Sequence, residues 1–310
     1  MNKILLYVVL LLSVVLCLVR SFRNETSFFS NTEREEETVD YQNTIIMLDV
    51  KNSNIMKIDI EDYLIGVVAG EMPALFNDEA LKAQAVAART YAYYKINSSH
   101  GNYDITNDSS SQVHLSKTEL LEKWGSDYDK YYNKIRNAVN ATENEVLVYQ
   151  NKIIPAYYFA MSNGYTEDSE LVFSEQKDYL KSVQSPEDRN VYEVISNFNK
   201  TNFCDKLQIT CPLINIDYIK RSNTNRVLSI SINNKVFAGS DFRKVLGLRS
   251  TDFDILIENE NVLITTRGYG HGVGMSQYGA NNLANLGYSY DEILSHYYTN
   301  VELVKVNSII

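Results

Sequence analysis

The sequence predicts an α+β fold, in which β-hairpins and helices follow one another in mixed order. Strand and helix patterns do not alternate regularly along the chain, which argues against a doubly wound parallel sheet. The 310 residues are 45% hydrophobic and 22% charged, which supplies enough apolar surface for the core of one large or two smaller domains. We therefore expect a grooved domain of one or two lobes over residues 41–310, after an N-terminal membrane anchor.

Residues 1–40 are predicted to form the anchor and a tether. Residues 4–19 carry no charge and lie between Lys3 and Arg20. This run is shorter than the roughly 20 residues that usually span a bilayer, so a cleaved signal peptide is the alternative. No Ala-x-Ala pattern follows it, which favours an uncleaved single span over residues 1–20. Residues 21–40 are polar and rich in glutamate, so we expect a solvated acidic tether.

The domain is predicted to open with a hairpin and a helix. Residues 44–50 and 55–60 have the composition of strands, and residues 52–54 between them favour a turn. Residues 61–69 fit a helix that is acidic in its first turn and apolar on one face. Gly70 marks its predicted end.

A second helix is predicted over residues 80–95, because Asn77 can cap it and no helix breaker interrupts it. The remaining predicted elements are a helix over 127–140, a hairpin of residues 146–149 and 153–160 turning at Asn151, strands over 227–232 and 262–266, and a helix over 289–298. Residues 192–212 show no clear pattern.

Glu71 is the first candidate for chemistry. If the first helix extends through it, Glu71 falls on the apolar stripe with Leu64 and Val67. Partial burial and the negative end of the helix dipole both raise a carboxyl pKa, as a general acid at neutral pH requires. The alternative is a loop carboxylate paired with a nearby arginine.

Two cations follow on the second predicted helix. Lys82 and Arg89 are seven residues apart, two turns along one face. They could hold an anionic or hydroxyl-rich ligand, or clamp Glu71. A solvated basic face is the ordinary explanation.

Glycines are concentrated near the C-terminus, at positions 268, 270, 272, 274 and 279. Alternating glycines allow sharp turns and close approach to the main chain, but the spacing is not that of a phosphate loop. His271 within this loop could act as a base, a ligand or a stacking group, or make a structural hydrogen bond. Residues 160–169, which follow Tyr157 and Tyr158, could line a sugar-binding groove or only connect two strands.

The net charge and the positions of the histidines and cysteines limit the partners and ligands that we expect. The net charge of −10 argues against a nucleic-acid partner. The four histidines form no short ligand cluster, so we expect no metal and no cofactor. Cys204 and Cys211 could form a disulfide on the oxidising side of a membrane, or remain free thiols.

In this order, the segments resemble the stage II sporulation protein D family, the peptidoglycan lytic transglycosylases of endospore-forming bacteria. The resemblance extends from about Asp59 to Leu303. The segments that carry it are residues 61–73, 80–91, 162–166, 242–250 and 268–280, and the run His296-Tyr297-Tyr298.

The resemblance implies cleavage of the MurNAc–GlcNAc bond in glycan strands stripped of stem peptides, which leaves 1,6-anhydro-MurNAc ends. The family's catalytic glutamate falls on Glu71, and its basic helix positions fall on Lys82 and Arg89. We expect the two loops to shape the substrate groove through Tyr158, Ser162, Tyr165, His271, Gln277 and Tyr278. Some relatives bind zinc near the position of His114, but no cysteine lies there, so no structural zinc is expected.

By the same resemblance, the protein would act in forespore engulfment with stage II sporulation proteins P and M. It would lie in the mother-cell membrane that faces the forespore, with the catalytic domain on the wall side. Two other classes fit the same segments: a non-catalytic enhancer of a partner cell-wall amidase, in which Glu71 would be structural, and a plain glycan-binding module.

Overall fold

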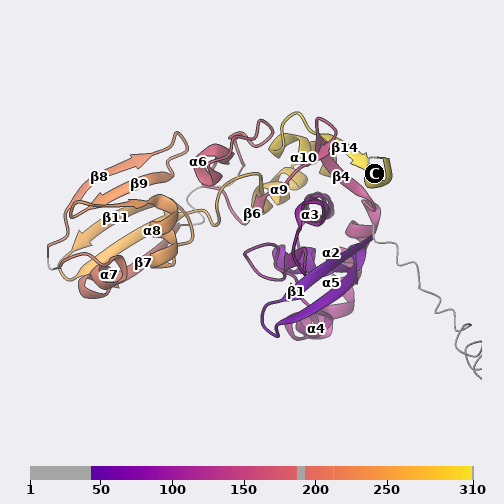
Figure 1. Ribbon diagram of the computed structural model, residues 1–310, viewed down its shortest axis with the longest axis horizontal. Helices are drawn as coiled ribbons and strands as arrows, with labels where there is room; N and C mark the ends of the chain where they lie inside the picture. Colours follow the sequence, from indigo (N-terminus) through magenta and orange to yellow (C-terminus); the bar gives the residue numbers. More distant parts are fainter. Residues whose placement is uncertain (1–42, 187–192, 212, 309–310) are drawn as a thin grey trace, which may run out of the picture. The chain divides into compact units, whose positions relative to one another are not determined.

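A computed structural model describes residues 43–186, 193–211 and 213–308. It shows a mixed α+β domain with several small sheets, which confirms the predicted fold class (Figure 1). Residues 44–310 group as one unit. The predicted anchor and tether lie outside the described residues. Within the described part of the chain, no helix combines the length and the apolar character needed to cross a membrane.

The domain opens with the predicted hairpin, in which β1 (Thr44–Asp49) pairs antiparallel with β2 (Asn54–Asp59). β3 (Ile105–Thr106) adds to the other edge of β1 in parallel. Helix α2 (Ile60–Glu71) follows β2 directly, because the Asp59 side chain accepts hydrogen bonds from the first free N–H groups of the helix. The helix is longer than predicted, since it continues through Gly70 and ends at Glu71.

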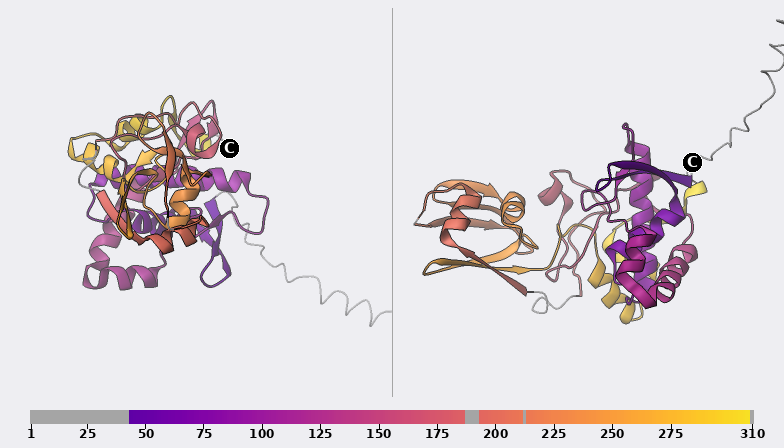
Figure 2. Two further views of the ribbon diagram at one scale, coloured as in Figure 1. Left: turned by 90° about the vertical axis from the view of Figure 1, so that its left-hand side faces the viewer. Right: turned by 90° about the horizontal axis from the view of Figure 1, so that it is seen from below.

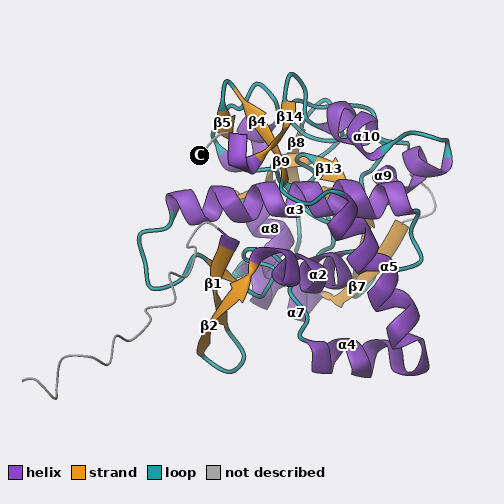
Figure 3. Cartoon of the chain, turned by 90° about the vertical axis from the view of Figure 1, so that its right-hand side faces the viewer, coloured by secondary structure: helices purple, strands orange, loops and turns teal. Residues whose placement is uncertain are grey.

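Helix α3 (Asp78–Ser98) is the central element of the first core, and Asn77 caps it as predicted. Its many buried alanines let other elements approach closely. α2, α5 (Tyr128–Ala141), α9 (Gln277–Asn285), α10 (Tyr290–Tyr297) and β4 (Glu145–Tyr149) all pack on it (Figure 3). α5 and α10 match the predicted helices. α4 (Lys117–Trp124), which begins with a capping box of Ser116 and Glu119, was not predicted.

The predicted second hairpin forms only in part. β4 pairs antiparallel with β5 (Lys152–Ile153), and β14 (Glu302–Lys305) pairs with the other edge of β4. The strand does not continue to Ala160, because Pro155 has no N–H for the ladder. The chain turns there, and β6 (Tyr158–Phe159) pairs in parallel with β13 (Met275–Ser276) instead.

A second hydrophobic core lies among the elements between residues 193 and 264 (Figures 1 and 2). Its strands form two antiparallel sheets, β7 (Glu193–Asn199) with β12 (Asn261–Arg267) and β11 (Asp252–Glu258), and β8 (Ile216–Arg221) with β9 (Val227–Ile232) and β10 (Lys235–Ala238). Strands β9 and β12 include the two predicted ones. Helices α7 (Lys200–Leu207) and α8 (Gly239–Leu246) contribute Phe203 and Phe242 to the core, whereas α6 (Ser169–Phe173) lies outside it. A disulfide joins Cys204 to Cys211.

Arg89 does not share a ligand-facing side of α3 with Lys82. Its side chain is fully buried, and its Nη2 and Nε donate to the two carboxylate oxygens of Glu61 at 2.6 and 2.8 Å. Arg89 also donates to the carbonyl oxygens of Val139 and Glu145, so one guanidinium links α3 to α2, α5 and β4. The helical spacing was predicted correctly, but that face is covered at Arg89 and open at Lys82.

We expect Arg89→Gln to destabilise the fold strongly. Removing one partner of a buried ion pair leaves Glu61 without its counter-charge, at a cost of about 3–5 kcal/mol in the free energy of unfolding. Lys82→Gln is the matched control, because Lys82 pairs with Glu79 at a partly exposed site and its loss costs less than about 1 kcal/mol. Urea denaturation of both variants measures the difference, and similar losses would contradict this role for Arg89.

Candidate functional site

Glu71 is half-buried at the C-terminal end of α2, where two groups hold its carboxylate. The main-chain N–H of Val113 donates to Oε1 at 2.7 Å. The side-chain Nε2 of Gln277, the first residue of α9, donates to Oε2 at 3.3 Å. Within the described part of the chain, its hydrogen-bond partners are thus an amide N–H and a carboxamide, with no second carboxyl group.

Two glycines let residues 113–115 lie directly on α2. A side chain at Gly70 would place its Cβ 2.5 Å from the Val113 carbonyl oxygen, and one at Gly66 would meet the His114 ring at 2.3 Å. The main-chain N–H of Leu115 donates to the Gly66 carbonyl oxygen at 3.2 Å. Because Gly66 and Gly70 are one helical turn apart, they form a strip without side chains, which brings the Val113 N–H within reach of Glu71.

A chain of hydrogen bonds connects side chains near Glu71. The Tyr63 hydroxyl donates to Gln112 Oε1 at 3.0 Å, and Gln112 Nε2 is 3.0 Å from the Tyr158 hydroxyl oxygen and 3.1 Å from the Ala88 carbonyl oxygen. Burial, and after it the charge of Glu71, raise the pKa of Tyr63 and of Tyr158 well above the usual value. Both phenols therefore stay protonated at neutral pH.

Burial raises the pKa of the Glu71 carboxyl above its ordinary value, as the sequence predicted. The hydrogen bonds from Val113 and Gln277 oppose this effect, because they stabilise the ionised form. The carboxyl is thus easier to protonate than that of an exposed glutamate, yet two hydrogen-bond donors stabilise its ionised form. A group that first gives and then takes a proton needs both properties.

His114 stacks on Tyr63 with ring centroids 5.3 Å apart and planes 4° from parallel. Burial lowers its pKa to about 4, so the ring is neutral at physiological pH. Among the described residues, no group of three or more histidine, cysteine, aspartate or glutamate side chains could hold a metal ion. His114 supports Tyr63 by packing.

The pairing of β6 with β13 brings two predicted site residues to Glu71. Tyr158 lies in β6, and Gln277 follows β13 directly. Tyr278 is next to them: its N–H donates to the Ala160 carbonyl oxygen at 3.1 Å, and its ring meets Phe76 edge-on at 4.9 Å. These residues come from the two loops expected to shape the groove.

The structure places the other predicted residues elsewhere. Lys82 binds Glu79 at 2.6 Å and lies 5.9 Å from the centre of the Tyr290 ring, whereas Arg89 is committed to Glu61. Ser162 is fully buried, and its hydroxyl accepts from the Gly164 N–H. Tyr165 is 49% exposed, and its carbonyl oxygen accepts from Arg226.

His271 lies among aromatic rings, with Phe173 5.4 Å and Phe159 5.7 Å away between centroids. Its Nδ1 accepts from the Val273 N–H at 3.0 Å. Burial, followed by the charges of Arg243 and Arg226, lowers its pKa to about 4. No hydrogen bond joins it to Glu71 in the described residues, so a role as base beside that carboxyl is not supported.

Three contributors to the site were missed from the sequence: Gln112, the Val113 N–H and Tyr63. Residues 112–114 belong to no helix or strand and show no periodicity. The available signal was the four-residue spacing of Gly66 and Gly70 on a helix face, which indicates close approach of another segment.

The fold and site describe an α+β domain with one protonatable carboxyl beside a tyrosine–amide network, and sequence comparisons identify its family. A family model described as stage II sporulation protein matches residues 49–149. The chain is 41% identical over 268 residues to stage II sporulation protein D of Bacillus amyloliquefaciens, which covers 83% of this chain and 77% of that relative. It is 39% identical over 266 residues to the protein of the same name from Bacillus subtilis (strain 168), covering 83% and 78%. The chain therefore belongs to the stage II sporulation protein D family.

A more distant relative has a different name. The amidase enhancer of Bacillus subtilis (strain 168) is 28% identical over 298 residues, which covers 77% of this chain and 40% of that protein.

We expect Gly70→Ala to disturb the hydrogen bond between Val113 and Glu71 and to destabilise the fold. The new methyl group would collide with the Val113 carbonyl and push the Val113 N–H away from Glu71, and such overpacking costs about 1–3 kcal/mol. Gly101→Ala is the control, because its Cβ would meet nothing closer than 3.8 Å. Thermal unfolding of the two variants tests this, and an equally stable Gly70→Ala protein would show that the contact is not tight.

Gln277→Leu should raise the pKa of Glu71 further. The Gln277 amide stabilises the ionised carboxylate, so its loss favours the protonated form, which then persists to higher pH. Carbon-13 NMR titration of the Glu71 carboxyl measures the shift. Gln176→Leu, at an exposed loop position, should leave the titration unchanged. An unchanged or lower pKa in Gln277→Leu would contradict the assigned contact.

Proposed function

We propose that this protein is a lytic transglycosylase that cleaves the MurNAc–GlcNAc bond of peptidoglycan strands stripped of stem peptides, and leaves 1,6-anhydro-MurNAc ends. The observation that carries the proposal is the state of Glu71: one half-buried carboxyl with a raised pKa and two hydrogen-bond donors on its oxygens. This chemistry needs a single carboxyl, unlike glycoside hydrolases that use a pair.

In the first step, protonated Glu71 donates its proton to the glycosidic oxygen, and the bond from that oxygen to the anomeric carbon breaks. In the second step, the Glu71 carboxylate takes the proton of the C6 hydroxyl on the same MurNAc, whose oxygen attacks the anomeric carbon. A bond between that oxygen and the anomeric carbon forms, no water is added, and Glu71 is protonated again. The Val113 N–H and Gln277 stabilise the carboxylate between the two steps.

The neighbours of Glu71 fit a sugar ligand. Tyr158 and Tyr63 keep their protons, so they present hydroxyl groups and ring faces rather than charge. We place the substrate groove along the loops that carry Tyr158, Gln277 and Tyr278. Exposed Tyr165 is a candidate for a more distant part of the groove.

The setting of this activity belongs to the same proposal. The family is one of sporulation, and we place the chain in the mother-cell membrane facing the forespore, held by residues 1–20, with the domain on the wall side. The Cys204–Cys211 disulfide supports an oxidising location outside the cytoplasm. Stage II sporulation proteins P and M are the expected partners during engulfment.

The second candidate function is enhancement of a partner cell-wall amidase without chemistry of its own. The similarity to the amidase enhancer of Bacillus subtilis (strain 168) favours it. In that case Glu71 would only join α2 to residues 113–115 and to α9.

Glu71→Gln separates the two functions. We expect cleavage of purified, peptide-free glycan strands to fall at least about a hundredfold, because a carboxamide cannot donate the proton. Mass spectrometry of the products scores the anhydromuramic ends. Glu122→Gln, an exposed carboxyl on α4, is the control and should cleave normally.

Stability measurements accompany that assay. Since burial makes the ionised Glu71 unfavourable in the folded protein, Glu71→Gln should melt at the same temperature as the parent or higher at pH 7. A folded Glu71→Gln protein that still produces anhydromuramic ends at the full rate would refute the catalytic assignment. A parent protein that produces none, but stimulates an amidase, would support the enhancer.

A further inference from the structure

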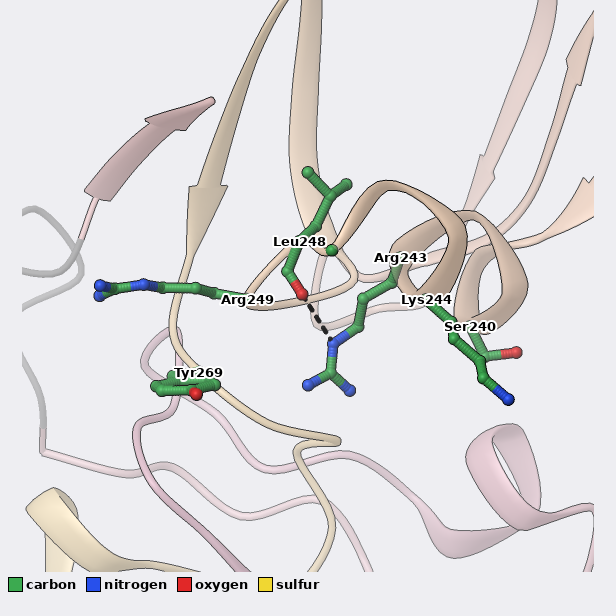
Figure 4. Close-up of a pocket in the computed structure, with 7 residues that line it drawn as sticks. Ser240, Arg243, Lys244, Leu248, Arg249 and Tyr269 are labelled. Atoms are coloured by element: carbon green, nitrogen blue, oxygen red, sulfur yellow. Dashed lines mark hydrogen bonds between the residues drawn. The ribbon is translucent and has the colours of Figure 1, made fainter. Parts of the chain in front are cut away.

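A cavity of about 490 Å³ lies beside α8, in the part of the domain with the second core. Its wall includes three cations, Arg243, Lys244 and Arg249, and the ring of Tyr269 (Figure 4). None of the described residues that line it carries a carboxylate. In a chain with a net charge of −10, this concentration of positive charge is local.

In the regions that the structure describes, no ion pair joins Arg243, Lys244 or Arg249 to an aspartate or glutamate. Cations that gather around a cavity without a described carboxylate beside them favour binding of an anion from solution.

Arg243 is held in place at the centre of this wall. Its Nε donates to the Leu248 carbonyl oxygen at 3.2 Å, which fixes the guanidinium plane. Among the described residues, none accepts a hydrogen bond from its two terminal nitrogens, and in Figure 4 these nitrogens lie between the side chains of Tyr269 and Lys244. The two terminal nitrogens of a guanidinium held in this way can donate to two oxygens of one carboxylate or phosphate.

Arg249 and Tyr269 form the other side. The Arg249 guanidinium is 5.5 Å from the centre of the Tyr269 ring, and the Arg249 carbonyl oxygen accepts from the Gly270 N–H at 3.0 Å. Tyr269 is 48% exposed, although it is a large ring that could have been buried. An exposed ring beside cations is suited to a ligand with both a charged group and a ring face.

A neighbouring cavity of about 380 Å³ adjoins the first one. It shares Arg243 and Ser240 with the first cavity and adds Arg226 and His271 to its wall. The carboxylate in its wall, Glu167, accepts hydrogen bonds from the hydroxyls of Ser222 and Thr224.

We infer that the cavity lined by Arg243, Lys244, Arg249 and Tyr269 is a binding site for an oxyanion, a carboxylate or phosphate carried on a sugar-like or polyol chain. Arg243 and Lys244 bind the oxygens, and the exposed face of Tyr269 packs on the carrier. Within the glycan, the group that supplies this oxyanion is the lactyl carboxylate of muramic acid. This choice rests on the proposed function. A phosphate of an anionic wall polymer has the same chemistry and is the other source.

One loop connects this cavity with Glu71. Residues 268–279 carry both Tyr269, which lines the cavity, and Gln277, which donates to Glu71. Tyr269 also pairs with Met161 through two main-chain hydrogen bonds. An anion bound by Tyr269 and its cations would therefore be attached to the same segment that positions the Glu71 partner.

The test measures binding rather than cleavage, with the whole chain carrying Glu71→Gln so that substrate is not consumed. The probes are peptide-free GlcNAc–MurNAc oligosaccharides, the same oligosaccharides with their lactyl carboxyls converted to amides, and a glycerol phosphate oligomer. Calorimetry compares the Glu71→Gln protein with versions that also carry Lys244→Gln and Arg249→Gln together, or Lys206→Gln as control. Lys206 is an exposed cation on α7, away from the cavity wall.

We expect the double substitution to weaken binding of at least one anionic probe about tenfold or more, and Lys206→Gln to have little effect. A loss confined to the carboxylated oligosaccharide, with the amidated one bound equally by both proteins, identifies the lactyl carboxylate. A loss confined to the glycerol phosphate oligomer identifies phosphate as the source. Anionic probes bound equally with and without Lys244 and Arg249, or bound by neither protein, would overturn the site.

This result is separable from the fate of the proposed function. Absence of anhydromuramic ends with the parent protein would reject the transglycosylase, while a charge-dependent difference in binding would still stand. Normal cleavage with equal binding would reject only the anion site.

Discussion

The contact between residues 113–115 and the glycine strip of α2 is the constraint on which the site depends. A helix normally keeps another segment at the distance of its side chains, and Gly66 and Gly70 remove that separation at two successive turns. The result is a main-chain N–H placed on a carboxylate and an imidazole stacked on Tyr63, neither of which needs an ionisable partner. The site is thus assembled mainly from backbone and neutral groups, in a chain with many charged residues to choose from.

Glu71 is balanced between two opposite influences. It ends α2, so the carbonyl end of that helix and the surrounding apolar atoms disfavour its charge. The side-chain amide of Gln277, the first residue of α9, donates to the same carboxylate. Burial is the larger effect, and the donors limit its size. In a fully apolar pocket without these donors, the carboxyl would keep its proton to a higher pH.

The sequence predicted the fold class, the first hairpin, the central helices and the partial burial of Glu71, because hydrophobic periodicity and capping residues are local properties. The sequence also offers Tyr158 and Gln277 as candidate site residues, but it does not show the pairing of β6 with β13 that brings them together. Arg89 shows the limit of an argument from periodicity. The spacing predicts on which face of a helix a residue lies, but not which elements cover that face. Residues 153–160 show that one proline can outweigh a strand-like run. Gln112 could not be found because it lies in no helix or strand and belongs to no periodic pattern, and the Val113 N–H could not because a main-chain donor leaves no trace in residue type.

The ion pair of Arg89 with Glu61 has a consequence for how α2 can vary. Glu61 lies in its first turn, and Glu71 is its last residue, so the ion pair holds one end of the helix and the half-buried carboxyl lies at the other. Each residue turns an α-helix by about 100°, so one residue gained or lost between them would rotate the carboxyl away from Val113 and Gln277 while leaving the ion pair intact. The length of the helix between Glu61 and Glu71 is therefore fixed. Its side chains can change within the limits of packing, but the number of residues between these two glutamates cannot.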